Sequence, residues 1–375
     1  MIDINRLDNQ TTEIVYSRFD FGVKYEMANS IVNNDINDSV LSLYREHLYY
    51  WNSFKEESPS KNSFDDYLGS FISLVKYVSS YGRKEEIIKL PPLPIANKRL
   101  INGMHRLATC CALNTTELLT YENIYSPYKY DQNFFENYTN PHNGKVFPSN
   151  LINKIGNSLV RSIPTKFFLI HSNSLQMDNG LYAYKKIEEN FNILYSTEFR
   201  SSLFSIHYLF SHLYAGQAWT MNSANGLLSF ANLSYKISEC IDLTKGEYLS
   251  RIIFIEPKNI EIIKKIKKDI RKYYGIDNHS IHSSDTIQES LDIALLLSTP
   301  KESVSMFNII NAHIPSLILD IVNLRVNNSY GVFKLNFEEI TSSFNYIKQL
   351  ETSSSLAFKK QDNKHIWFLG SLIIW

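Results

Sequence analysis

A helical pattern of apolar residues begins just after position 63. Apolar side chains recur there every three or four residues, at Phe64, Tyr67, Leu68, Phe71, Ile72, Val75 and Val78. This spacing places them on one face of a helix. Ser63 can cap the helix with Asp66 three residues on, and Gly82 is positioned to end it.

The pattern then changes to short apolar runs. Residues 87–90 form one run, and residues 93–101 form two more with Asn97-Lys98 between them. A polar pair between apolar runs predicts a tight β-hairpin. Asn102-Gly103 then turns the chain, and residues 105–113 predict a second helix. The predicted order is helix, hairpin, turn, helix.

The second half of the chain follows a polar stretch at residues 172–180. Residues 181–246 are rich in aromatic side chains and predict a mostly helical region. Residues 251–255 predict a strand, 258–274 a basic helix and 286–297 a further helix. The expected fold class is mixed α/β.

The length of 375 residues exceeds what a single hydrophobic core usually supports. We therefore expect two domains, an α+β domain over 1–175 and a mixed α/β domain over 176–375.

The charge of the chain argues against a nucleic-acid partner. There are 38 basic and 38 acidic residues, so the formal net charge is zero and the basic excess typical of phosphate-backbone binding is missing. The three cysteines form no disulfide framework. The sequence shows neither a secretory signal nor an apolar run of membrane-spanning length. We therefore expect a cytoplasmic protein.

The segment Asn102-Gly103-Met104-His105-Arg106 has the composition of an anion site. A strand ends, glycine permits a sharp turn, and the free N–H groups of the next helix face outward at the positive end of its dipole. Arg106 adds a planar fork for phosphate oxygens, and His105 adds a donor that can carry charge. The alternative is a surface turn that binds nothing.

This segment resembles the glycine-x-His-Arg box of the ParB/sulfiredoxin superfamily. The superfamily includes sulfiredoxins, nucleotide-dependent ParB partition proteins and free-serine kinases. The helix and hairpin before the box also stand where that fold places them, and the resemblance covers roughly residues 64–115. It implies an N-terminal domain of that fold that binds a nucleotide at residues 102–106.

Three departures from the family pattern restrict the chemistry. Met104 stands where sulfiredoxin has its reactive cysteine, and a thioether cannot act as a thiolate nucleophile. Asn102 stands where the serine-kinase relatives have aspartate, so this residue can position a hydroxyl or a metal-bound water but cannot be a base. The helix-turn-helix of the partition proteins is not recognisable, which disfavours a DNA-binding role.

The resemblance implies a small-molecule phosphotransferase that uses ATP or ADP with Mg²⁺ to phosphorylate a hydroxyl group. His105 is one candidate catalytic residue. The reaction also needs a carboxylate base, and the position of the glutamate in the kinase relatives favours Glu57 or Glu56. Other carboxylates that remain open are Glu85, Glu86 and Asp131. The alternative function is a nucleotide-binding regulatory or scaffold module without catalysis.

The second half contains one candidate cluster, His282, Asp285 and Glu289. On a helix these residues would share a face suited to a metal or phosphate. The alternative is helix-start chemistry, because Thr286 and Glu289 match a capping box.

Two further expectations concern partners. The basic helix over 258–274 can contact a phosphorylated substrate or an acidic membrane surface. The order of a GxHR box followed by "IHSSDTxxE" resembles proteins of bacterial surface-polysaccharide biosynthesis loci. That likeness favours a sugar or polyol as the acceptor.

Overall fold

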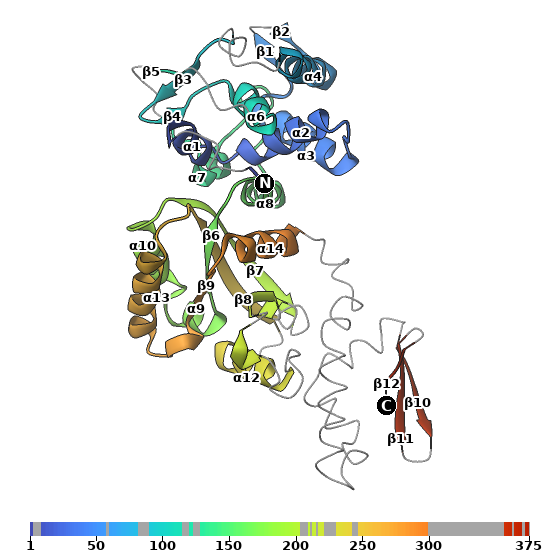
Figure 1. The fold of residues 1–375 in the computed structure, drawn as a ribbon, viewed down its shortest axis with the longest axis vertical. Helices are drawn as coiled ribbons and strands as arrows, with labels where there is room; N and C mark the ends of the chain where they lie inside the picture. Colours follow the sequence, from blue (N-terminus) through green and yellow to red (C-terminus); the bar gives the residue numbers. More distant parts are fainter. Residues whose placement is uncertain are drawn as a thin grey trace.

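The chain is a mixed α/β protein in a computed structural model. The structure describes residues 1–2, 9–57, 60–81, 90–114, 120–122, 128–202, 209–210, 212–214, 217–220, 230–241, 247–298, 356–361, 364–369 and 372–374. Figure 1 shows an N-terminal unit coloured from blue to green, followed by a second unit coloured from green to orange.

The N-terminal unit is largely helical. Its elements are α1 (Asn9–Tyr16), α2 (Phe21–Val32), α3 (Asp38–Asn52), β1 (Glu56–Glu57), β2 (Ser60–Lys61), α4 (Phe64–Tyr81), β3 (Leu93–Ala96), β4 (Arg99–Leu100), α6 (Met104–Ala112), β5 (Thr120–Glu122), α7 (Gln132–Asn137) and α8 (Ser149–Ser162). Helix α2 is buried along most of its length and packs against α3, α4, α6 and α8. The other helices of the unit are therefore arranged around α2.

The predicted helix after Ser63 is confirmed as α4. Ser63 Oγ accepts a hydrogen bond from the Asp66 N–H at 3.2 Å, and the Asp66 carboxylate accepts one from the Ser63 N–H at 3.0 Å. This reciprocal pair is a capping box with aspartate in the place of glutamate. The apolar face of α4 is buried at Tyr67, Phe71 and Val75. The proposed stop at Gly82 lies outside the described residues.

The predicted hairpin is also confirmed. Strands β3 and β4 pair antiparallel, and Asn97 and Lys98 both adopt positive φ at the turn. Two positive φ values are the geometry of a type I′ turn, which fits the twist of a hairpin. Strand β5 pairs with β3 in parallel, which completes a three-stranded sheet in the order β4-β3-β5. Helix α6 follows β4 directly, as the sequence predicts.

The second unit is built on a four-stranded antiparallel sheet in the order β7-β8-β6-β9. Its elements are β6 (Lys166–Ile170), α9 (Ser172–Asp178), α10 (Leu181–Glu188), β7 (Ile193–Ser202), the 3-10 helix η2 (Ala218–Thr220), α12 (Phe230–Cys240), β8 (Glu247–Ile255), α13 (Ile260–Tyr274), the 3-10 helix η4 (Asp277–His279), β9 (Ile281–Ser283) and α14 (Ile287–Ser298). The strand predicted at 251–255 and the helices predicted after Pro257 and Thr286 are confirmed as β8, α13 and α14. The prediction of a mostly helical region at 181–246 was wrong over β7.

Further along the chain, the backbone forms an antiparallel meander. Strand β10 (Leu356–Gln361) pairs with β11 (Lys364–Leu369), which pairs with β12 (Leu372–Ile374).

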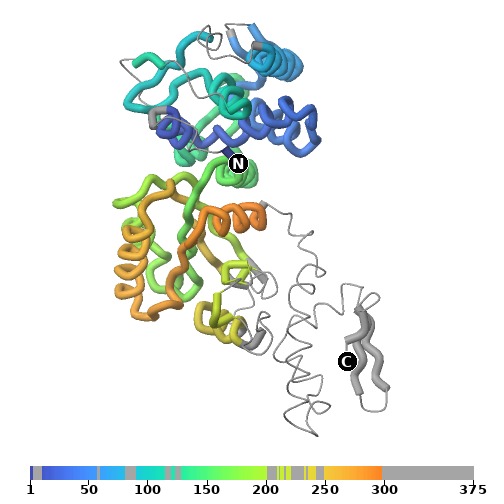
Figure 2. Tube along the Cα trace, viewed as in Figure 1, coloured from blue at the N-terminus to red at the C-terminus, as the bar shows by residue number. Residues whose placement is uncertain are grey.

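Alternate residues of the four-stranded sheet face two different cores. In β6, Phe168 and Ile170 pack with the apolar stripe of α13, whereas Phe167 and Leu169 belong to the core shared with the N-terminal unit. This alternation follows from the two-residue period of a strand. Figures 1 and 2 show α10 and α13 on one side of the sheet.

Helix α8 joins the two units. It contacts α2 and α3 in the N-terminal unit, and β7 and α14 in the second. A Cβ at Gly156 would overlap the Tyr195 ring, so glycine permits the close approach of α8 to β7. Strand β6 precedes the predicted boundary at 175 and pairs with β8 and β9, so the sheet of the second unit begins before that position.

Within the described part of the chain, every helix is too short or too polar to cross a bilayer.

Candidate functional site

The turn between β4 and α6 requires glycine for two reasons. Gly103 has a φ of +88°, which disfavours residues with a Cβ. A Cβ there would also lie 2.6 Å from Leu93 Cδ2 and 2.8 Å from Arg106 Nη2. The Gly103 N–H donates to Asn102 Oδ1 at 2.6 Å, and the Gly103 carbonyl accepts from the Leu107 N–H at 3.0 Å. The predicted turn is therefore built by exposed Asn102 and tightly packed Gly103.

The N-terminus of α6 has no side-chain cap from the described residues. A helix starts with N–H groups that have no intrahelical acceptor, and these attract negative charge. Met104 contributes only its backbone here, because its side chain is buried in the core. The start of α6 therefore has the backbone chemistry of an anion site.

Arg106 lies across this turn. Its Nη1 donates to the carbonyl of Pro91 and, at 3.5 Å, to that of Pro92. Its Nη2 lies against Gly103, 2.8 Å from where a Cβ at that position would stand. One end of the fork is thus held by backbone carbonyls and the other lies beside the turn. The sequence predicted a guanidinium fork at this turn for phosphate oxygens; it did not indicate the contacts with the two proline carbonyls.

The His105 side chain faces the interior, where it is not a charged donor. Its Nε2 lies 2.9 Å from the Tyr44 hydroxyl, and its ring packs edge-on against Phe71 at 4.6 Å. Burial lowers the pKa of His105 to about 3, with Lys24 and Lys61 acting in the same direction. The ring is therefore neutral at physiological pH. The expectation that His105 carries charge to a ligand is not met in this arrangement.

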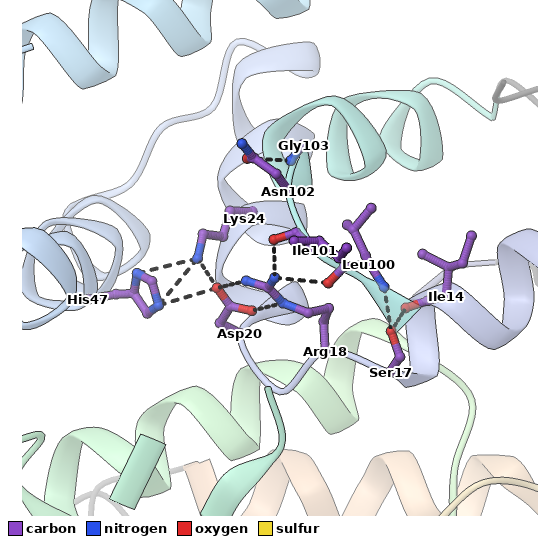
Figure 3. A network of polar contacts seen from close by, with 10 residues as sticks. All are labelled: Ile14, Ser17, Arg18, Asp20, Lys24, His47, Leu100, Ile101, Asn102 and Gly103. Carbon is purple, nitrogen blue, oxygen red and sulfur yellow. Dashed lines mark hydrogen bonds and ion pairs between the residues drawn. The ribbon is translucent and has the colours of Figure 1, made fainter. Parts of the chain in front are cut away.

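A buried ion cluster, which we call the Asp20 cluster, lies beneath the turn (Figure 3). It consists of Arg18, Asp20, Lys24 and His47, whose side chains are 6%, 2%, 5% and 0% exposed. Arg18 contacts both carboxylate oxygens of Asp20, at 3.0 and 3.2 Å, and Lys24 pairs with the same carboxylate. His47 Nε2 lies 3.2 Å from Lys24 Nζ.

The Asp20 cluster carries one more positive than negative charge. Burial and the nearby Lys24 keep the pKa of His47 well below its usual value, so the imidazole is neutral. Arg18 and Lys24 then face a single carboxylate. Burial lowers the pKa of Lys24 to about 8 against the opposing effect of Asp20, which leaves most of the lysine protonated at pH 7.

Arg18 connects this charge to the turn. Its Nη1 donates to the carbonyls of Leu100 at 3.2 Å and Ile101 at 3.4 Å, in the two residues before Asn102. Figure 3 shows the guanidinium between Asp20 and this backbone. The uncapped start of α6 is thus backed by a net positive charge in a poorly solvated interior. None of the four residues of the Asp20 cluster could be identified from the sequence, because they come into contact only in the folded chain.

The β1–β2 hairpin brings further polar groups to the His105 side. Glu56 forms an ion pair with Lys61, and Lys61 Nζ lies 4.7 Å from the Tyr67 ring centroid. Burial raises the pKa of the Tyr44 hydroxyl, and the nearby Glu56 carboxylate raises it further. Glu56 therefore provides a carboxylate on this side of the site.

The remaining candidate bases fall elsewhere. The Glu57 side chain and residues 85 and 86 lie outside the described residues. Asp131 caps α7 by accepting from the Phe134 N–H at 3.0 Å and pairs with Lys129 at 3.1 Å.

Asp131 also lines a cavity of about 280 Å³ between the two units. The lining includes Glu13, Lys98 and Glu256 but no residue of α6. The cavity is therefore separate from the Gly103 turn.

The second-unit candidates are only partly brought together. His282 lies on strand β9 and not on a helix, so the predicted common helical face is wrong. His282 Nε2 nevertheless lies 2.7 Å from Glu289 Oε1, while Asp285 contributes its N–H to Glu289 Oε2 at 2.8 Å. Thr286 Oγ1 accepts from the Glu289 N–H at 3.0 Å. The bonds of Asp285 and Thr286 with Glu289 are helix-start chemistry, the alternative that the sequence left open, whereas the His282–Glu289 pair is a side-chain contact between β9 and α14.

In the described part of the chain, no group of three or more His, Cys, Asp or Glu residues is arranged to hold a metal ion.

The chain was also compared with known proteins. No protein-family model, curated protein or solved structure matches it.

Proposed function

We propose that the N-terminal unit binds the phosphates of ATP or ADP at the Gly103 turn and transfers a phosphoryl group to an alcohol. The observation that carries this proposal is the uncapped start of α6 above the net positive Asp20 cluster. Phosphoryl transfer depends mainly on positioning and on stabilising negative charge. A fixed cationic interior behind free N–H groups supplies both.

The residues around the turn have distinct parts in this proposal. The first N–H groups of α6 bind phosphate oxygens, and Arg106 Nη2 adds a charged donor beside Gly103. Asn102 is exposed and can orient the acceptor hydroxyl. Glu56 is the described carboxylate best placed to accept its proton, once Lys61 is displaced. Neutral His105 holds Tyr44 and shapes the pocket wall.

Mg²⁺ would arrive with the nucleotide. The described residues offer no ready-made metal site, and Mg²⁺ in such sites is held largely by substrate phosphates and water. Bound in that way, the ion would neutralise charge on the transferred group.

A nucleotide-binding module without catalysis is the second candidate. The ion pairs of the carboxylates near the turn favour it, because a paired carboxylate is a poor base. Glu56 pairs with Lys61, and Asp20 pairs with Arg18 and Lys24. Asn102 also cannot act as a base.

Two measurements on the full chain separate these functions. Calorimetry with ATP and with ADP tests binding, and ADP release in the presence of sugars, polyols or serine tests transfer. We expect binding, and turnover with at least one acceptor. Glu56→Gln and Glu57→Gln, compared in parallel, should show which carboxylate turnover needs while nucleotide affinity is retained. Binding without turnover on every acceptor would favour the regulatory module, and absence of binding would overturn both.

A further inference from the structure

A second group of basic side chains gathers at one end of the sheet in the second unit. His171 follows β6, Lys236 lies on α12 and Arg271 lies near the end of α13. Their contacts converge on four consecutive residues, 278–281. The His171 N–H donates to the Ser280 carbonyl at 3.1 Å, Lys236 Nζ to that of Asn278 at 2.7 Å, and Arg271 Nη2 to that of Ile281 at 3.5 Å. We call these three residues the His171 cluster.

Polar atoms of this region are buried without hydrogen-bond partners. His171 is 0% exposed, yet neither ring nitrogen has a partner among the described residues. The same holds for Arg271 Nε and for the hydroxyl of fully buried Ser250. Ile170 pairs with Arg251, so His171 and Ser250 are the next positions along the same strand pair. Buried polar groups normally find partners, because leaving them unpaired is costly.

The two cations of this region also lack a direct ion pair, although Glu239 acts on Lys236 and Asp277 acts on Arg271 from a longer distance. Neither Lys236 nor Arg271 forms a salt bridge with a described carboxylate, and the nearby Glu289 is engaged by His282. Lys236 is only 8% exposed. The positive charges of Lys236 and Arg271 both lie close enough to His171 to disfavour its protonation. Two aromatic rings border the His171 cluster. The Phe210 ring centroid lies 5.3 Å from that of His171, and the Tyr214 ring centroid lies 5.7 Å from Lys236 Nζ.

We propose that the His171 cluster binds a phosphate group, carried either by inorganic phosphate or by a phosphorylated small molecule. Two cations without carboxylate partners match a doubly charged oxyanion, and the buried imidazole and the Arg271 Nε–H supply donors to its oxygens. This site lies on the second unit and does not depend on nucleotide binding at the Gly103 turn.

The test is thermal unfolding of the full chain in phosphate-free buffer, with inorganic phosphate or glycerol 3-phosphate added. The variants are His171→Phe, which removes both ring nitrogens, and Arg271→Met, which removes the charge. Lys268→Met is the matched control, since Lys268 is an exposed lysine on the same helix. Arg106→Ala serves as a background in which the α6 turn is impaired.

We expect either ligand to raise the unfolding midpoint of wild type, Lys268→Met and Arg106→Ala. In His171→Phe and Arg271→Met the affinity should fall at least about tenfold, as expected for loss of a charge-assisted hydrogen bond. His171→Phe should be at least as stable as wild type without ligand, because it removes unpaired polar atoms. Equal ligand effects in all variants, or none in wild type, would overturn the proposal and leave ordered water as the partner of His171. Loss of the effect only in Arg106→Ala would assign phosphate to the turn instead.

Discussion

The Asp20 cluster and the His171 cluster both hold two basic side chains beside buried polar groups, but the two clusters balance that charge differently. In the Asp20 cluster, Arg18 and Lys24 share a carboxylate, and Arg18 also donates to two backbone carbonyls. In the His171 cluster, the described residues provide no carboxylate salt bridge, and several buried polar atoms have no partner. The first arrangement is complete within the fold. In our proposal, an added anion completes the second.

This difference indicates what each cluster does. A satisfied cluster positions backbone and supplies a fixed electric field without changing when a ligand binds. An unsatisfied cluster costs folding stability that a ligand can recover. Under our two proposals, the protein combines a preorganised support under one turn with a site that gains stability on binding.

The largest expected effect comes from removing the shared carboxylate. Asp20→Asn leaves Arg18 and Lys24 buried without a counter-charge, and breaking such a pair typically costs about 3–5 kcal/mol. Denaturant unfolding measures this loss. The control is Glu13→Gln, which breaks the exposed ion pair with Lys98 and should cost less than about 1 kcal/mol. Equal effects of the two substitutions would contradict the structural role of the Asp20 cluster.

Removing a cation from the His171 cluster should not lower the free energy of unfolding, in contrast to Asp20→Asn. Lys236→Met deletes a buried charge that lacks a salt bridge to any described carboxylate. Without added anion, the free energy of unfolding should stay the same or rise, and denaturant unfolding in phosphate-free buffer measures it. A loss as large as that of Asp20→Asn would show that the two clusters do not differ as described.

Loss of Arg106 should weaken nucleotide binding by about 1.5–3 kcal/mol, the range for a hydrogen bond to a charged group. Arg106→Lys should restore only part of the affinity, because the planar fork is lost. Calorimetry with ATP measures both. Arg99→Ala is the matched control, since Arg99 is an exposed arginine on β4. An affinity of Arg106→Ala equal to that of the control would remove Arg106 from the proposed phosphate site.

His105 should give a pH-dependent contribution to stability. Its folded pKa of about 3 lies below the ordinary value for histidine, so the unfolded chain binds the proton more readily. The stability that His105 contributes is therefore present above about pH 6.5 and is lost as the pH falls towards 3. The difference in unfolding free energy between wild type and His105→Gln should shrink over this window. A difference that grows on acidification would mean that the folded protein prefers charged His105.

The hairpin and the α6 turn could be predicted because their signals are local. Asn97-Lys98 and Gly103 specify positive φ positions within a few residues of sequence. The Asp20 cluster could not be predicted, because Asp20 just before α2 and Lys24 in its first turn resemble an ordinary exposed pair until α3 brings His47 against Lys24. No pattern in the neighbouring sequence indicates that the Asp20 cluster is buried.

The second unit was harder to predict for a related reason. Strand β7 is the outer strand of its sheet and alternates apolar and polar side chains only weakly, so its aromatic residues suggested helix packing. Strand β9 has three residues, too few to show a period, so the sequence gives no sign that His282 lies on a strand outside the helix of Glu289.

The smallest expected effects separate the two interpretations of residues 282–289. Thr286 Oγ1 caps α14, so Thr286→Ala should cost about 0.5–2 kcal/mol of stability. Asp285 contributes its N–H to Glu289 and its carbonyl to Lys166, and both are backbone groups that Asp285→Asn retains. That substitution should therefore leave both the melting temperature and any turnover nearly unchanged. Glu289→Gln keeps an amide oxygen for the Asp285 N–H but weakens the contact with His282, so its cost should lie between the two. Loss of turnover in Asp285→Asn at an unchanged melting temperature would restore a catalytic role to this carboxylate.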